Sequence, residues 1–278
     1  MKTRTLRSLA VQLWLPAVVL VVLWFSTANS KSFYFPPFSE VLVALRDGFV
    51  EGSLVGDIAF SMRNVLAGLV LATVVGILLG FLIGESRSLR VAAQPFLDYL
   101  RATPMVAFIP VIILTFGIGA APKVFLIFLG AVWPILLNTI SGVHGIATAV
   151  RESARAYRIP AALRLRKVLL PAALPQIFAG IRISLSVAIV MMIVGEIYGS
   201  PHGLGHFILD AGQRFQVKDT WAGTLLIGVI GYLMTLVLLG IERVCLGWYV
   251  RRPPRMRRQD RRLAPAARQE DESRFAAV

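Results

Sequence analysis

The sequence predicts an all-α, polytopic membrane protein with about six transmembrane helices. Hydrophobic residues make up 56% of the 278 residues and charged residues only 16%. Six apolar windows approach the roughly 20 residues that a helix needs to cross a bilayer. A soluble nucleic-acid-binding protein could carry the formal net charge of +14, but not a mean hydropathy of +0.72. The composition also excludes a disordered basic chain, and the single cysteine excludes an intrachain disulfide framework.

The first of the six windows admits two interpretations. The windows are 9–25, about 64–84, 105–118, about 124–140, about 177–198 and about 221–241. Basic residues before the first window and small residues at 26–28 resemble a cleavable signal peptide. Its apolar run of 17 residues is longer than the usual signal core. Segment 1–30 is therefore predicted to remain as a transmembrane helix.

The third window is short, and Pro104 and Pro110 predict a bend in it.

The distribution of basic residues predicts the orientation. Of the 29 Lys and Arg residues, 22 fall in the connections on one side, which are 1–8, 85–103, 142–176 and 242–278. Basic connections stay in the cytoplasm, so both termini are predicted to be cytoplasmic. Segment 31–60 is then extracytoplasmic and contains an amphipathic helix at about 40–49. The tail 251–278 is predicted to be disordered and to lie against anionic lipid of the bilayer, with no role in binding nucleic acid.

Two features inside the predicted spans are candidates for the transport pathway or a subunit interface. Small residues recur at every fourth position of the second span, at Gly68, Ala72, Gly76, Gly80 and Gly84. Such a stripe lets another helix approach closely, either inside one subunit or, at Gly76 and Gly80, along the pathway. Arg182 and Glu196 are ionisable residues within the fifth span. They are predicted either as anchors at the membrane surface or as pathway or interface residues.

Motifs for enzymatic chemistry are missing from the sequence. It contains no phosphate-binding Gly-x-x-x-x-Gly-Lys-Ser/Thr loop and no Gly-x-Ser-x-Gly nucleophile motif. His202, His206 and Asp210 are spaced four apart, but Gly203 and Gly205 make a continuous helix there unfavourable, so no metal site is predicted. The chain is predicted to be no enzyme and to bind no cofactor of its own.

The basic segment 148–176 predicts two short helices. The first should end at Ile159, because the residue before a proline avoids helical geometry. Pro160 can open the second helix, where its missing N–H costs nothing. Leu170-Pro171 should end that helix, and Pro175 should mark the start of the fifth span. An ordinary amphipathic surface hairpin is the alternative to a docking element.

This segment resembles the signature loop of bacterial ABC-importer permeases, written Glu-Ala-Ala-x₃-Gly-x₉-Ile-x-Leu-Pro. Glu152-Ser153-Ala154 occupies the opening and Val168-Leu169-Leu170-Pro171 the close. Arg158 stands where the family has Gly, so the turn is expected to use less demanding dihedral angles, shaped by Pro160. Ala154 and Tyr157 are expected to share a face of the first helix that suits a groove on a partner.

The resemblance extends over roughly 55–245 and is closest to the sulfonate, nitrate and taurine branch. Five stretches support this branch: 101–110, 116–119, 171–175, 180–182 and Gly203-Leu204-Gly205. The family implies a fold like that of type I ABC importer permeases, with a core at 61–245 and a cytoplasmic coupling loop at 148–171. The implied docking residues for an ATPase are Glu152, Ser153, Ala154, Tyr157, Arg158, Pro160, Leu170 and Pro171.

The resemblance also implies partners and a location. Two permease copies, expected to be identical, would form a pathway in the inner membrane of a bacterium. Two separate ATPase subunits would bind ATP and Mg, and an extracytoplasmic binding protein would deliver and select a small solute. A secondary transporter or channel that works alone is the main alternative, and a membrane-embedded enzyme or scaffold is a further one.

Overall fold

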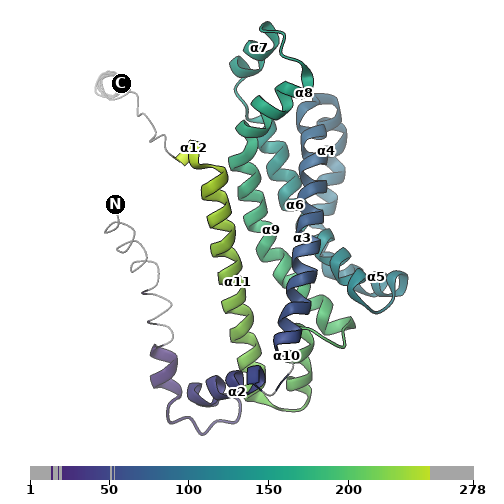
Figure 1. The fold of residues 1–278 in the computed structure, drawn as a ribbon. Coiled ribbons are helices and arrows are strands. Elements are labelled where there is room, and N and C mark those ends of the chain that lie inside the picture. The colour runs from purple at the N-terminus through teal and green to yellow at the C-terminus, as the bar shows by residue number, and fades with distance from the viewer. Residues whose placement is uncertain (1–13, 15–17, 19–20, 51, 53, 251–278) are drawn as a thin grey trace, which may run out of the picture. The chain divides into compact units, whose positions relative to one another are not determined.

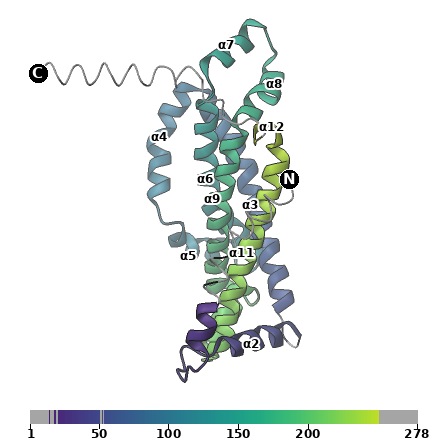
Figure 2. The same cartoon turned by 90° about the vertical axis from the view of Figure 1, so that its left-hand side faces the viewer.

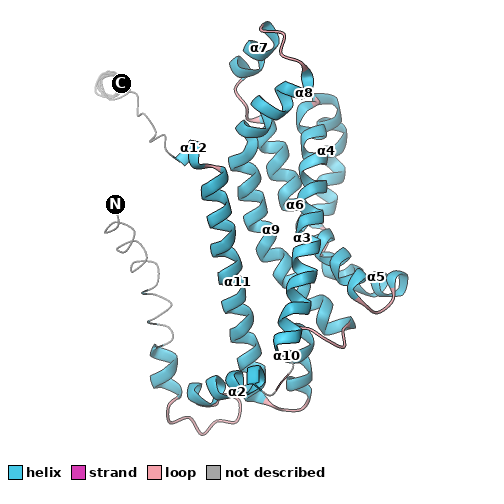
Figure 3. Ribbon diagram, viewed as in Figure 1, coloured by secondary structure: helices cyan, strands magenta, loops and turns pink. Residues whose placement is uncertain are grey.

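The computed structural model describes residues 14, 18, 21–50, 52 and 54–250, and every regular element among them is a helix (Figure 3). The chain forms two units that divide after Leu236, inside helix α11 (Val217–Cys245). The described part of the second unit holds the end of α11 and the short helix α12 (Gly247–Val250). The predicted tail 251–278 and most of the window 9–25 lie outside the described residues, although 21–27 are helical.

Four helices among the described residues are long and apolar enough to cross a membrane. They are α3 (Leu54–Glu85), α6 (Ala120–His144), the continuous helix Ala161–Gly199, and α11. A fifth span results if α4 (Arg87–Ala102) and the helical stretch Met105–Phe116, which meet at a bend of 82°, are counted together. The structure therefore confirms a multi-span helical protein with four or five of the six predicted spans.

The predicted third span at 105–118 is wrong as a single helix. The stretch consists of a 3₁₀ turn, η1 (Met105–Phe108), followed by α5 (Ile109–Phe116), whose 8 residues are too short to cross a bilayer. Segment 85–103, predicted as a connection, contains helix α4 instead. The break follows from Thr103, which is extended at φ −79° and ψ 127°, and from Pro104, which cannot continue a helix.

Helices α3, α6 and α9 (Leu170–Gly199) run side by side and form the core (Figure 1, Figure 2). The stripe of small residues on α3 is buried against α6. A Cβ atom at Gly76 would lie 2.9 Å from Ile135 Cγ2, and one at Gly80 would lie 2.5 Å from Thr139 Cβ. The stripe is therefore a packing surface inside the subunit, which was one of the two interpretations of the sequence.

Pro171 does not end the helix before it, contrary to the prediction. Helix α8 (Ala161–Arg164) runs through a π turn, η2 (Leu165–Leu169), directly into α9. In the π turn the N–H of Leu170 donates to the carbonyl of Leu165. A proline ring in a regular α-helix presses against the carbonyl four residues earlier, and the wider turn relieves that contact. The proline thus reshapes the helix without breaking it.

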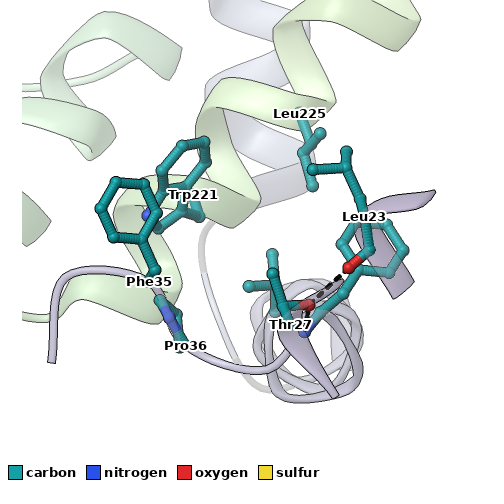
Figure 4. Close-up of a pocket in the computed structure, with 8 residues that line it drawn as sticks. Leu23, Thr27, Phe35, Pro36, Trp221 and Leu225 are labelled. Carbon is teal, nitrogen blue, oxygen red and sulfur yellow. Dashed lines mark hydrogen bonds between the residues drawn. The ribbon is translucent and has the colours of Figure 1, made fainter. Parts of the chain in front are cut away.

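The amphipathic helix predicted at about 40–49 is confirmed as α2 (Phe38–Val50). It lies beside the first turns of α11, where Lys218 Nζ is 2.7 Å from Glu40 Oε2. Trp221 Nε1 donates to the carbonyl of Tyr34 over 3.0 Å. Figure 4 shows the apolar pocket of about 70 Å³ that this junction encloses. Its lining residues are Leu23, Thr27, Phe35, Pro36, Phe38, Val41, Trp221 and Leu225.

Candidate functional site

The predicted coupling loop forms a helical hairpin at one end of the core. Helix α7 (Thr148–Ala156) and helix α8 lie beyond the point where α3 and α6 end and α9 begins (Figure 1). Residues 145–147 connect α6 to α7, and the π turn connects α8 to α9. Helix α7 ends three residues before the predicted boundary at Ile159.

The turn after α7 contradicts the expectation for Arg158. This residue has a φ of 50°, in the left-handed region that glycine favours. The N–H of Ile159 donates to the carbonyl of Ala154 over 3.1 Å, and the N–H of Arg158 donates to that of Arg155 over 2.8 Å. These two bonds form a Schellman motif, which requires the left-handed conformation at Arg158. Pro160 directly precedes the first residue of α8, one position before the first helical position that the sequence predicted for it.

Most of the predicted docking residues are exposed on the hairpin. Glu152, Ser153, Tyr157, Arg158 and Pro160 are exposed, Leu170 and Pro171 are half-buried, and Ala154 is buried. A shallow hollow on the hairpin is lined by Ala149, Val150, Ser153, Ala154, Tyr157, Ile159 and Val168. Ala154 and Tyr157 therefore border the same hollow, although the tyrosine is 82% exposed and the alanine only 4%.

Sequence reasoning missed the ion pair that joins the hairpin to the core. Arg151 Nη1 on α7 lies 2.8 Å from Glu85 Oε2 at the end of α3. Arg151 Nη2 donates to the carbonyl of Val143 near the end of α6. In the sequence, Arg151 contributes only to the number of basic residues that predicts the orientation. The two partners are separated by 66 positions in the sequence, so no local pattern connects them.

A second polar cluster lies at the other end of the core, where α10 (Leu204–Gln213) begins (Figure 1). Ser61 Oγ is 2.8 and 2.9 Å from the two carboxyl oxygens of Glu196, and the N–H of Gly205 donates to Glu196 Oε2 over 2.9 Å. Asp57 Oδ1 accepts from the N–H of Gly203 over 2.7 Å. Glu196 is 0% exposed, so it is not the membrane-surface anchor that the sequence left open.

The Gly203-Leu204-Gly205 motif fits this cluster closely. Gly203 has a φ of 111°, and a Cβ atom there would lie 2.5 Å from the Glu196 carboxyl group. A Cβ atom at Gly205 would lie 2.5 Å from the carbonyl oxygen of Ile193 on α9. Leu204 between them is fully buried, and its N–H donates to Ser61 Oγ over 3.0 Å. The side chains of α3 and α9 thus satisfy the first backbone donors of α10, which no intrahelical carbonyl can reach.

Lys123 on α6 completes the polar surroundings of this end. Its side chain is buried, its Nζ donates to the carbonyl of Gly119 over 2.5 Å, and Nζ lies 5.3 Å from the ring centroid of Phe60. Arg182, the other candidate from the fifth span, is exposed on α9. Among the residues that the structure describes, no three His, Cys, Asp or Glu side chains group in a way that could hold a metal ion.

Residues 72–245 match the family described as the inner membrane component of binding-protein-dependent transport systems. The chain belongs to this family. The permease is 34% identical over 208 residues to the putative aliphatic sulfonates transport permease protein SsuC of Bacillus subtilis, covering 75% of both chains. It is 36% identical over 199 residues to the bicarbonate transport system permease protein CmpB of Synechococcus elongatus, covering 71% of both chains. It is 28% identical over 239 residues to the taurine transport system permease protein TauC of Escherichia coli, covering 83% of this chain and 87% of TauC.

The fold of the permease is also that of a solved ABC transporter. An inward-facing form of the MetNI methionine ABC transporter superposes with a TM-score of 0.61 at 21% identity, over 69% of this chain and 95% of that chain. The predicted resemblance to the sulfonate and taurine permeases is confirmed. The permease is a multi-pass membrane transport subunit of an ABC system, and permeases of such systems work with ATPase and binding-protein partners.

Proposed function

We propose that this chain forms the translocation pathway of an ATP-driven importer for a small solute such as a sulfonate, taurine, nitrate or bicarbonate. Two identical copies would enclose the pathway. Two separate ATPase subunits would bind ATP and Mg and dock on the α7–α8 hairpin, and a binding protein would deliver the solute at the opposite end. The chain itself would bind no cofactor or metal.

The observation that supports this proposal is the continuity of the hairpin with a membrane-spanning helix. The helix Ala161–Gly199 has 39 residues without a break, so it is roughly 60 Å long at 1.5 Å per residue. A force applied to exposed residues of α8 would therefore reach the far end of α9 along one unbroken helix, and residues 157–160 link α7 to the start of that helix. The hollow on the hairpin offers a surface on which a partner could exert that force.

The charge distribution supports the proposed orientation in the inner membrane of a bacterium. Six Lys and Arg residues lie between 142 and 176, around the hairpin, and basic connections stay in the cytoplasm. The hairpin and both termini would then be cytoplasmic. Helix α2 and the start of α10 would face the binding protein, and the window 9–25 would supply a sixth span.

The docking role is tested by Glu152→Lys, which reverses an exposed charge on α7. We expect this variant to insert into the membrane but to lose co-purification with the ATPase subunits of its transport system, and to lose uptake. The matched control is Asp47→Lys, which reverses an exposed charge on α2 and should leave co-purification unchanged. Full retention of the ATPase by the Glu152→Lys variant would contradict the assignment of the hairpin.

A stand-alone secondary transporter or channel makes the opposite prediction. Vesicles that contain only this chain and an ion gradient would then take up solute without nucleotide. We expect no uptake from such vesicles, and uptake only after the ATPase subunits, ATP and the binding protein are added.

A further inference from the structure

Helix α7 is attached to the core by the chain on both sides. On one side the four non-helical residues 157–160 lead into α8 and through the π turn into α9. On the other side, the three non-helical residues 145–147 lead back to α6. Neither connection continues the axis of α7 into a core helix, so the backbone alone does not make α7 rigid with the ends of α3 and α6. Any rigid connection between α7 and the ends of α3 and α6 must come from side chains.

Arg151 makes such a connection at the point where two helices end. Glu85 is the last residue of α3, and Val143 lies in the last turn of α6. Carbonyls in a last turn lack intrahelical donors, and the C-terminal end of a helix carries partial negative charge. The Arg151 side chain, only 19% exposed, places one guanidinium nitrogen 2.8 Å from the Glu85 carboxylate and the other against the Val143 carbonyl. It therefore binds both helix ends at once.

The shape of the side chain matters as much as its charge. A guanidinium group presents its donors in a rigid, planar fork, whereas a lysine ammonium is a compact charge on a flexible stem. Only the fork can hold the carboxylate and the carbonyl together in a fixed geometry. Helix α7 cannot move away from α3 and α6 unless both of these bonds break.

We propose that Arg151 is a positioning residue that fixes α7 to the ends of α3 and α6. A displacement of α7 then moves α3 and α6 together with α9, so that three core helices respond to one contact. This inference rests on the proposed function, because it takes α7 as the surface on which the ATPase acts. Without Arg151, a displacement of α7 would reach the core only through its two non-helical connections, and ATP hydrolysis would be poorly converted into transport.

The test uses the complete transporter, with its ATPase subunits and binding protein, in proteoliposomes. We expect Arg151→Met to retain the ATPase subunits and hydrolyse ATP, but to lower uptake per ATP hydrolysed by at least about tenfold. Arg151→Lys, which keeps the charge without the fork, should fall between Arg151→Met and the unchanged protein. Glu85→Gln, which leaves the Val143 bond in place, should have a smaller effect than Arg151→Met.

A distance measurement tests the same attachment without any partner. Spin labels are placed at Leu82 on α3 and Arg155 on α7, both exposed, in a background in which Cys245 is replaced by serine. The distance distribution should be narrow when Arg151 is present and should broaden in Arg151→Met. The matched control is Arg214→Met, which removes an exposed ion pair with Asp210 (3.1 Å) near the end of α10. This variant should change neither the distance distribution nor the uptake per ATP hydrolysed.

The outcomes separate this inference from the proposed function. If Arg151→Met has the same distance distribution and the same uptake per ATP as the unchanged protein, the positioning role is wrong. If the unchanged permease fails to bind the ATPase subunits, the proposed function is wrong. In that case the spin-label distances alone decide whether Arg151 holds α7.

Discussion

The two ends of the core use polar side chains in different ways. At the start of α10, Ser61 and Glu196 are fully buried, and they join α3, α9 and α10 through a closed set of hydrogen bonds. At the α7 end, the Arg151 guanidinium contacts the Glu85 carboxylate and the Val143 carbonyl, and the Arg151 and Glu85 side chains are 19% and 35% exposed. Breaking a buried hydrogen bond leaves donors without partners, whereas groups near the surface can bond to water instead. The hydrogen bonds at the start of α10 therefore take more free energy to break than those at the α7 end, so the α7 end moves more easily.

The largest expected effect comes from removing the buried carboxyl group. Glu196→Ala takes away the acceptor for the Gly205 N–H and for the Ser61 hydroxyl. Each donor left buried without a partner costs about 1–3 kcal/mol, so we expect the free energy of unfolding to fall by about 2–5 kcal/mol. Thermal unfolding in detergent measures this loss.

Glu196→Gln is the matched control, because its amide oxygen can still accept a hydrogen bond from either the Gly205 N–H or the Ser61 hydroxyl. It should be destabilised less than Glu196→Ala. If Glu196→Ala unfolds at the same temperature as the unchanged protein, the cluster does not hold this end together and the contrast between the two ends fails.

A smaller effect is expected where α3 packs on α6 between the two ends. Gly80→Ala would place a methyl group 2.5 Å from Thr139 Cβ, whereas Gly56→Ala on the same helix meets no atom within 4 Å. Overpacking a core typically costs about 1–3 kcal/mol. Alanine at an open helical position gains up to about 1 kcal/mol over glycine. The two variants should therefore shift the midpoint of thermal unfolding in opposite directions, and a shift in the same direction would contradict the close approach of the helices.

The smallest effect compares two turns of the same type, one near each end. Phe215, like Arg158, has a positive φ, at 57°, and the N–H of Gln216 donates to the carbonyl of Ala211 over 2.9 Å. The left-handed conformation strains a residue that has a Cβ atom by about 1 kcal/mol, so replacing either residue with glycine removes that strain. We expect Phe215→Gly to raise the midpoint of thermal unfolding.

Arg158→Gly lies in the exposed hairpin, which can open locally without unfolding the core. We expect it mainly to slow proteolytic cleavage within 145–169. Equal shifts of the unfolding midpoint in both variants would show that the hairpin unfolds together with the core. That result would contradict the difference in stability between the two ends.

Hydropathy and charge predicted the long helices α3, α6 and α11 and the position of the hairpin, because these features depend on local composition. The patterns predicted a bend at Pro104, where the structure has a break with an angle of 82°, but they failed at Pro171. One proline interrupts a helix and the other is accommodated by a π turn, and local composition does not distinguish the two cases. The contacts of Arg151 with Glu85 and of Ser61 with Glu196 span 66 and 135 residues, so no local pattern reveals them. Arg158 shows that the hydrogen bonds of a turn can impose a backbone conformation that its side chain disfavours.

The π turn at Leu165–Leu169 also places one additional residue between the hairpin and the membrane core. A π turn holds one more residue than the α-helical turn it replaces. Each residue of an α-helix turns the chain by about 100° around the axis. Four such residues turn the chain by about 400°, and the five residues of the wider turn cover nearly the same angle, so α8 and α9 keep nearly the orientation around the axis that a regular helix would give them. Deleting one residue here would therefore leave the direction of the hairpin nearly unchanged and would bring the ring of Pro171 against the carbonyl four residues earlier.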